Sequence, residues 1–167
     1  QYYEPLEIGE RLLVVPEWID CSEEGRVPLR LDPGLLFGTG SHATTRMCLA
    51  ALEKYAGAGV RALDLGCGSG ILGIGALVLG SEHCTACDID PKAPDTVMEN
   101  AALNGIGGDK MQVYAGDIIG DAKLRKLLGS GYDVVLANIV SDVIIPLAPF
   151  VRGFMAPGGV FITSGII

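Results

Sequence analysis

The sequence lacks a long hydrophobic run and an excess of positive charge. Its longest apolar stretch, from Ile71 to Leu79, is interrupted by glycines and reaches about half of the ~20 residues that a membrane-spanning helix needs. Lys and Arg number 12 against 20 Asp and Glu, which gives a formal charge of −8. Domains that hold nucleic-acid backbones without sequence preference present a basic face. We therefore expect no membrane contact and no direct nucleic-acid binding.

The sequence also shows no internal repeat and no low-complexity tract. Residues 1–4 provide no initiator Met and neither the basic nor the apolar region of a signal peptide, so we expect a fragment of a longer cytoplasmic chain. A length of 167 residues suits a single domain with a sizeable core. Because 49% of the residues are hydrophobic and only 19% are charged, we expect this chain to fold rather than to be disordered.

Five cysteines is an odd number in a chain of this size and indicates reduced thiols. Cys84 and Cys87, next to His83, have the spacing of a redox or zinc pair. However, they lie in a predicted strand, where side chains three residues apart point to opposite faces. We interpret them as small buried hydrophobic residues and expect no metal site.

Glycine and proline divide the chain into short apolar runs that alternate with longer helical ones. This pattern is typical of an α/β fold, a mostly parallel sheet with crossover helices on both faces. Residues 1–40 are predicted to form a short N-terminal β appendage, with strands at 12–15 and 28–31, and a loop. Residues 41–167 form the main part of one compact domain. Its predicted strands are residues 60–65, 84–89, 111–115, 134–137 and 160–163.

The helices between these strands are predicted from caps and breakers. Ser41 can cap a helix that reaches about residue 55, and residues 71–79 form a very apolar helix. Asp90 can cap the next helix, with Pro91 at its first position. A short helix fits within residues 120–131. Residues 141–155 are predicted to form a helix that two prolines damage. A turn at 157–159 leads into the last strand. Because an exposed apolar edge strand invites pairing with other chains, we expect the natural chain to continue and to cover this strand.

The central motif is a strand that ends in three alternating glycines, Gly66, Gly68 and Gly70, before a helix. Such glycines let a ligand approach the backbone closely, and the N–H groups of the helix start favour an anionic group. The spacing from Gly68 to Gly73 also fits the dinucleotide pattern, with Asp88 about twenty residues further on. The glycines alone therefore leave two cofactor classes open.

Three acidic residues lie close to predicted strand ends. Asp64 would repel a pyrophosphate but suits S-adenosylmethionine, which carries an ammonium and a sulfonium cation; alternatively, it bonds loop N–H groups. Asp88 has the chemistry to bind both ribose hydroxyls, and capping of the next helix is the alternative. Asp117 is a candidate for the adenine amino group or a solvated loop residue.

At this point the sequence resembles a known family. The stretch from Asp32 to Thr45, DPGLLFGTGSHATT, resembles the signature loop of the ribosomal protein L-eleven methyltransferases (PrmA type). The agreement continues through 63–72, 88–91, 99–100, 104–105, 137–139 and 164–166, so it covers nearly the whole chain from about Leu6. The long loop is more specific than the glycine turn, which every class I methyltransferase shares.

The resemblance implies a Rossmann-like class I methyltransferase fold with S-adenosylmethionine as cofactor. By position it implies that four residues contact the cofactor, namely Thr45, Gly66, Asp88 and Asn138. It also implies that Phe37, Thr39 and His42 fold over its methionine end. Local bonding by His42 and core packing by Phe37 are the alternatives. With the residues above, the candidate cofactor-binding set is Phe37, Thr39, His42, Thr45, Asp64, Gly66, Gly68, Asp88, Asp117 and Asn138.

The chain departs from the family at three points. It has Ser41-His42-Ala43 where members usually have Thr-His-Pro, and Pro94 in a helix where a helix former is usual. The separate N-terminal domain that grips the ribosomal protein, and the terminal strands of the family's sheet, are not in this sequence. We therefore expect the catalytic domain alone.

Methyl transfer is an in-line displacement on an activated methyl group, so the protein chiefly positions the reactants. Asn138 follows the fourth strand, where this fold holds the target amine, and is the catalytic candidate; capping of the next turn is the alternative. Ile139-Val140 follows in place of the Pro-Pro-aromatic sequence of enzymes that methylate bases or glutamine, which favours a flexible aliphatic amine. The resemblance implies α-amino and lysine ε-amino groups of ribosomal protein L-eleven as targets.

Two other functions remain open from the sequence. A nicotinamide-dependent oxidoreductase of Rossmann type would use the overlapping glycine pattern, but Asp64 and the lack of a Tyr-x-x-x-Lys pair argue against it. A non-catalytic binding module would use the same fold, but it has no need to keep Thr45, Asp88 and Asn138 together.

Overall fold

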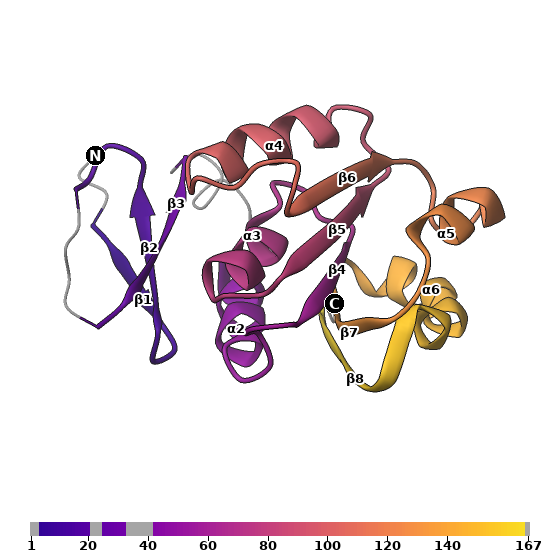
Figure 1. Ribbon diagram of the computed structural model, residues 1–167. Coiled ribbons are helices and arrows are strands. Elements are labelled where there is room, and N and C mark those ends of the chain that lie inside the picture. The colour runs from indigo at the N-terminus through magenta and orange to yellow at the C-terminus, as the bar shows by residue number, and fades with distance from the viewer. Residues whose placement is uncertain (1–3, 21–24, 33–41, 166–167) are drawn as a thin grey trace.

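The computed structural model describes residues 4–20, 25–32 and 42–165. Its main feature is a five-stranded sheet in which all neighbouring strands are parallel, with the order β6-β5-β4-β7-β8 (Figure 1). The strands are β4 (Arg61–Leu65), β5 (His83–Asp88), β6 (Met111–Ala115), β7 (Tyr132–Asn138) and β8 (Met155–Ser164). The strand order reverses at β4. This is the predicted Rossmann-like sheet, and such sheets bind ligands at the carboxyl ends of the strands, where the order reverses.

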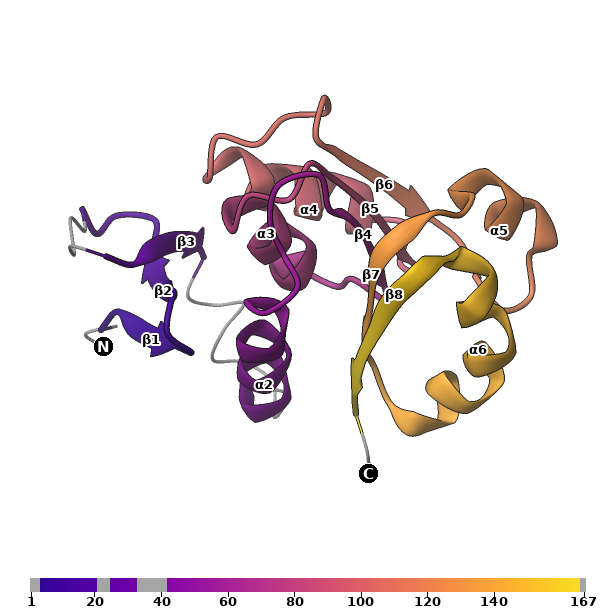
Figure 2. The ribbon, with the colours of Figure 1, turned by 60° about the horizontal axis from the view of Figure 1, so that its bottom comes forward.

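Helices cover both faces of this sheet, as Figure 2 shows. On one side lie α2 (His42–Leu52), α3 (Ile71–Val78) and α4 (Ala93–Ala102), and on the other α5 (Ala122–Leu128) and α6 (Ser141–Phe154). Each face has its own buried apolar cluster. Cys84 belongs to the first cluster and Cys87 to the second, so the two thiols lie on opposite faces as predicted. No helix within the described ranges has the length and apolarity that a bilayer crossing requires.

The N-terminal segment forms a second, three-stranded sheet. It contains β1 (Leu6–Ile8), β2 (Leu12–Pro16) and β3 (Val27–Leu31). β1 pairs antiparallel with β2, whereas β2 and β3 are parallel. β1 was not predicted, because three residues are too few for an alternating pattern to be visible. The sheet packs against α2 and α3. Gly75 of α3 lies where the three meet, since a Cβ there would be 2.7 Å from the Leu49 side chain of α2 and 3.8 Å from the Leu29 side chain of β3.

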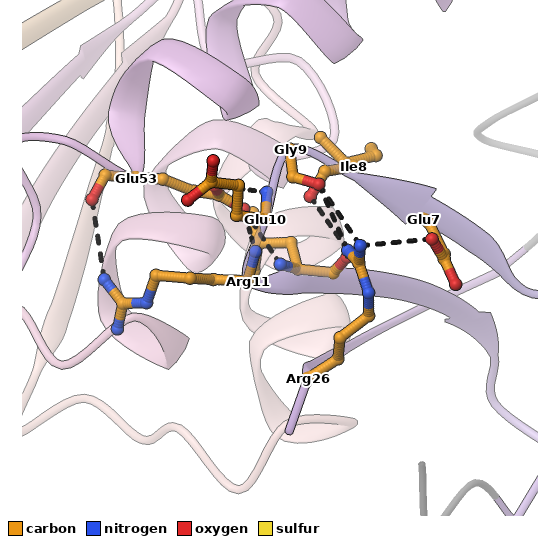
Figure 3. Close-up of polar contacts among 8 residues, drawn as sticks. Glu7, Ile8, Gly9, Glu10, Arg11, Arg26 and Glu53 are labelled. Carbon is orange, nitrogen blue, oxygen red and sulfur yellow. Dashed lines mark hydrogen bonds and ion pairs between the residues drawn. The ribbon is translucent and has the colours of Figure 1, made fainter. Parts of the chain in front are cut away.

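Glu53, just after α2, holds the turn between β1 and β2 (Figure 3). Its two carboxylate oxygens accept hydrogen bonds from the backbone N–H groups of Glu10, Arg11 and Leu12 at 2.8 to 2.9 Å. Partial burial opposes ionisation, but these bonds and the charge of Arg11 outweigh it and lower the pKa of Glu53. An ionised carboxylate therefore joins the small sheet to the main domain.

The predicted start of α4 was wrong by two residues. The helix begins at Ala93, and Pro91 lies in the turn before it. Asp90 stabilises that turn, because its carboxylate accepts a hydrogen bond from the Lys92 N–H at 2.9 Å and its carbonyl accepts one from Ala93. Pro94 lies within the first helical turn, where a missing N–H costs little.

The predicted damage to the last helix was also wrong. α6 is continuous from Ser141 to Phe154 and contains both Pro146 and Pro149. Both prolines are exposed, and so are Asp142 and Ile145, whose carbonyls lose their partners. Because these residues lie on the exposed side of the helix, water can bond the freed carbonyls, and the helix continues past each proline.

Candidate functional site

The glycine turn after β4 has a left-handed backbone at three positions. The φ angles of Gly66, Gly68 and Gly70 are +66°, +53° and +83°. A Cβ at Gly66 would overlap the side chain of Ile139, and one at Gly70 would lie 2.6 Å from a methyl group of Val97. Among the residues that the structure describes, a Cβ at Gly68 would have no neighbour within 4 Å. Gly66 and Gly70 are therefore required by packing, whereas Gly68 borders open space.

Asp88, the last residue of β5, is bonded directly to this turn. Its Oδ2 accepts a hydrogen bond from the Gly68 N–H at 2.8 Å, and its Oδ1 accepts one from the Asp90 N–H at 2.9 Å. The backbone carbonyl of Cys87 accepts from the N–H groups that follow β4. The predicted juxtaposition of Asp88 with the glycine turn is thus present, and the carboxylate is half-buried.

Asp64 is buried beneath the glycine turn and is not exposed at the ends of the strands. Only 1% of the residue is exposed, and its Oδ2 accepts a hydrogen bond from the Gly73 N–H of α3 at 3.0 Å. Burial, with a contribution from the charge of Asp88, raises the pKa of Asp64 to about 7, against the hydrogen bond from Gly73, which lowers it. The geometry matches the interpretation of Asp64 as an anchor for loop and helix N–H groups.

Asn138, the last residue of β7, is bonded on both sides. Its Nδ2 donates to the Thr45 hydroxyl of α2 at 3.0 Å, and its Oδ1 accepts from the Ser164 hydroxyl of β8 at 2.6 Å. Thr45 and Asn138 were predicted as separate cofactor contacts, and the structure brings them together. α2 carries Thr45 in its first turn, where backbone N–H groups lack helical partners.

Of the remaining predicted site residues, only Asp117 has a side chain that the structure describes. Asp117 follows β6 and is exposed, and its Oδ1 accepts from the Ile119 N–H at 3.0 Å, so it stabilises its own loop. Phe37 and Thr39 lie outside the described residues. His42 begins α2, and its side chain is not among those described.

Two asparagines that sequence reasoning did not single out support the glycine turn. Asn100 in α4 is buried and donates to the Ser69 carbonyl at 2.8 Å. Asn104 donates to the Asn100 carbonyl and, with both ends of its amide, bonds the backbone N–H and C=O of Arg30 in β3. A chain of hydrogen bonds therefore connects the small sheet to the turn. The family resemblance included both asparagines, and this was the signal that could have found them.

The ends of β4, β5, β7 and β8 thus form one polar edge. It offers an acceptor pair at Asp88, an open backbone at Gly68, and an amide joined to a hydroxyl at Asn138 and Thr45. In the part of the chain that the structure describes, no three His, Cys, Asp or Glu side chains are grouped to hold a metal ion. Such an edge can bind a ligand that carries a diol and a carboxylate.

Comparisons with known proteins identify relatives of this chain. The chain is 46% identical over 168 residues to a ribosomal protein L11 methyltransferase of Pelotomaculum thermopropionicum, and 44% identical over 165 residues to one of Chromohalobacter salexigens. The alignments cover 100% and 99% of this chain, but 52% of each relative. The chain therefore spans about half the length of these curated relatives.

A solved structure and a family profile complete the comparison. The crystal structure of ribosomal protein L11 methylase from Lactobacillus delbrueckii subsp. bulgaricus matches with a TM-score of 0.82 at 30% identity, over 99% of this chain and 81% of that one. The profile described as "Ribosomal protein L11 methyltransferase (PrmA)" matches residues 1–167. The chain belongs to the PrmA family of ribosomal protein L11 methyltransferases.

Proposed function

We propose that this chain is the S-adenosylmethionine-binding catalytic domain of a protein N-methyltransferase. Its targets are the α-amino and lysine ε-amino groups of ribosomal protein L11. The observation that carries the proposal is the polar edge itself, with Asp88 bonded to Gly68 on one side of Gly66 and Asn138 bonded to Thr45 on the other. Membership of the PrmA family supports the substrate class.

The residues present fit this cofactor. Each oxygen of Asp88 accepts one backbone hydrogen bond and has a further lone pair, so the carboxylate can bind two ribose hydroxyls. Gly68 borders open space where a nucleoside can approach the backbone. Thr45 accepts from Asn138 and keeps its own proton to donate, which suits the carboxylate of the methionine end.

Charge also favours a cationic cofactor over a pyrophosphate. Asp64 and Asp88 lie close enough that the charge of Asp88 contributes to the raised pKa of Asp64. A cationic group near Asp88 would offset that repulsion, whereas a pyrophosphate beside the same carboxylate would add to it. This argument favours S-adenosylmethionine over a nicotinamide dinucleotide.

The chain's own part in the reaction is to position the amine. When bound, S-adenosylmethionine supplies a methyl group activated by its sulfonium. Asn138 Oδ1 accepts from Ser164 and has a second lone pair, which can accept an N–H of the incoming amine and orient its lone pair. The amine must be neutral, and an α-amino group, with a reference pKa of about 8, loses its proton more readily than lysine at about 10.4.

The residues after Asn138 suit an aliphatic amine. Ile139 is half-buried and packs against Gly66, and the Val140 side chain is largely exposed. Neither residue offers a flat aromatic face on which a base would stack. The methylated group is therefore proposed to be a flexible amine of a protein.

The remaining assignments are part of the same proposal. Residues 1–40 serve as the β appendage and cofactor-covering loop, and residues 41–167 as the catalytic part. The protein acts in the cytoplasm on a ribosomal protein, without binding nucleic acid directly or attaching to a membrane.

Transfer of a labelled methyl group tests the proposal. The chain is mixed with S-adenosylmethionine labelled in its methyl group and with ribosomal protein L11, either intact or acetylated at its amines. We expect label in the intact protein under single-turnover conditions, none in the acetylated protein, and at least tenfold less with Asn138→Ala. Equal labelling of both substrates, or none of either, would contradict the proposal.

A further inference from the structure

Ser164 and Asn138 are partners at the ends of two neighbouring strands. β7 and β8 are parallel, and their paired positions run up to Asn138 opposite Ser164. Gly165 follows with φ +110°, and its Cα lies so close to the Ile139 carbonyl that a Cβ there would overlap it. The two strand ends are therefore held together just beyond this pair, which places the Ser164 hydroxyl beside the Asn138 amide.

The distances around Asn138 distinguish the two ends of its amide. The contact with Ser164 measures 2.6 Å, which is typical of an O–H···O hydrogen bond. The contact with Thr45 measures 3.0 Å, which is typical of N–H···O. The carbonyl oxygen therefore faces Ser164, and the NH2 group faces Thr45.

Cys48 of α2 also bonds Ser164. Its Sγ donates to the Ser164 Oγ at 3.4 Å. Burial raises the pKa of the Cys48 thiol, so it stays a donor at neutral pH. Asn138 Oδ1 can only accept, so the Ser164 proton points to it, and the Ser164 oxygen accepts from the thiol. Cys48, Ser164, Asn138 and Thr45 thus form one directed chain of hydrogen bonds.

We propose that Ser164 is a positioning residue that fixes the orientation of the Asn138 amide in the cofactor site. This inference rests on the proposed function. With the amide fixed, Thr45 receives a hydrogen bond and directs its own proton into the site, and Asn138 presents an acceptor to the amine. Without the Ser164 hydroxyl, the amide group can rotate so that its NH2 group, instead of its carbonyl oxygen, faces the incoming amine. The N–H groups of the amine then meet another donor and have no acceptor.

A matched pair of variants separates positioning from general strand stability. Ser164→Ala removes the hydroxyl that bonds Asn138, and Thr163→Val removes the neighbouring hydroxyl of β8, which donates to the Ala137 carbonyl of β7 at 2.9 Å. Ser164→Thr restores a hydroxyl at the critical position. Each variant is titrated with S-adenosylhomocysteine by calorimetry, and the side-chain amide signals of Asn138 are recorded by NMR.

We expect Ser164→Ala to bind about tenfold more weakly and to shift the Asn138 amide signals. Thr163→Val should bind within twofold of the wild type with unchanged signals, and Ser164→Thr should recover most of the affinity. Wild-type affinity and unchanged signals in Ser164→Ala, or equal losses in Ser164→Ala and Thr163→Val, would overturn the inference while leaving the proposed function intact. A wild-type chain that does not bind S-adenosylhomocysteine would overturn both.

Discussion

The Asp88 carboxylate bonds the Gly68 N–H at 2.8 Å, and so one side chain both shapes the glycine turn and faces the open space beside it. The second oxygen bonds the Asp90 N–H at 2.9 Å, which leaves the carboxylate little freedom to rotate. A ligand diol would therefore meet acceptors that are already in place. Preorganisation of this kind reduces the entropy lost on binding.

Replacement of Asp88 by Ala should weaken S-adenosylhomocysteine binding by about 1–3 kcal/mol, the range for loss of hydrogen bonds to a charged group. Asp88→Asn keeps one oxygen and should lose less. Calorimetric titration of both variants measures this, and Asp142→Ala, at an exposed position in α6, is the control. An unchanged affinity in Asp88→Ala would remove this residue from the site.

Two glycines of the turn should respond differently to alanine. Gly70→Ala combines a left-handed φ with a contact of 2.6 Å to the buried Val97, so it should lower the free energy of unfolding by about 2–4 kcal/mol. Gly68→Ala has no such contact and should cost about 1–2 kcal/mol for its backbone conformation alone. Its methyl group would nevertheless enter the open space beside Asp88 and weaken ligand binding. Urea unfolding and ligand titration of both variants separate the two effects, and equal losses of stability would contradict this assignment.

The buried Asp64 should make the ligand-free chain less stable at alkaline pH. The pKa of Asp64 is raised to about 7 in the folded state. The stability that protonated Asp64 contributes to the fold is therefore fully present below the ordinary pKa of 3.8 and is lost as the pH rises through about 7. Asp64→Asn stays neutral throughout. Relative to the wild type, this variant should therefore gain stability between pH 5 and pH 8, which urea unfolding at the two pH values measures. A stability difference that stays constant between them would show that Asp64 is ionised across the whole range.

The Glu53 contact should have the opposite pH dependence. The pKa of Glu53 is lowered on folding, so its stabilisation is complete above the ordinary value of about 4.3 and is lost as the pH falls below it. Glu53→Gln should cost about 1–2 kcal/mol at pH 7, because three backbone hydrogen bonds are weakened at a site that is partly screened by solvent. The cost should shrink between pH 5 and pH 3. Glu99→Gln, at an exposed position in α4, is the control, and the same pH profile in both variants would argue against the assignment.

The sequence was sufficient to predict the main sheet and the polar edge at its strand ends. Strand ends at Gly66, Asp88 and Asn138 could be recognised from apolar runs that stop at glycine or a polar residue, and a parallel sheet brings such ends to one edge. Bonds within a few residues of each other, such as the one from Asp88 to Asp90, follow the known habits of Asp at turns.

The pairing of Asn138 with Ser164 could not be predicted in this way. Between two paired positions β7 advances from Tyr132 to Val134, whereas β8 advances from Met155 to Val160, because the predicted turn at residues 157–159 is an irregularity inside the strand. The residue that faces Asn138 depends on this irregularity, which apolar periodicity does not reveal.

Calorimetric titration of the wild-type chain with S-adenosylhomocysteine and, in parallel, with NAD tests the central claim most directly. The positions of Asp88, Gly68, Thr45 and Asn138 predict saturable binding of S-adenosylhomocysteine at one site and no measurable heat with NAD. The same titration with Asp88→Ala should show the weakened binding predicted above. Saturable binding of NAD, with no binding of S-adenosylhomocysteine, would contradict the account and assign the glycine turn to a dinucleotide.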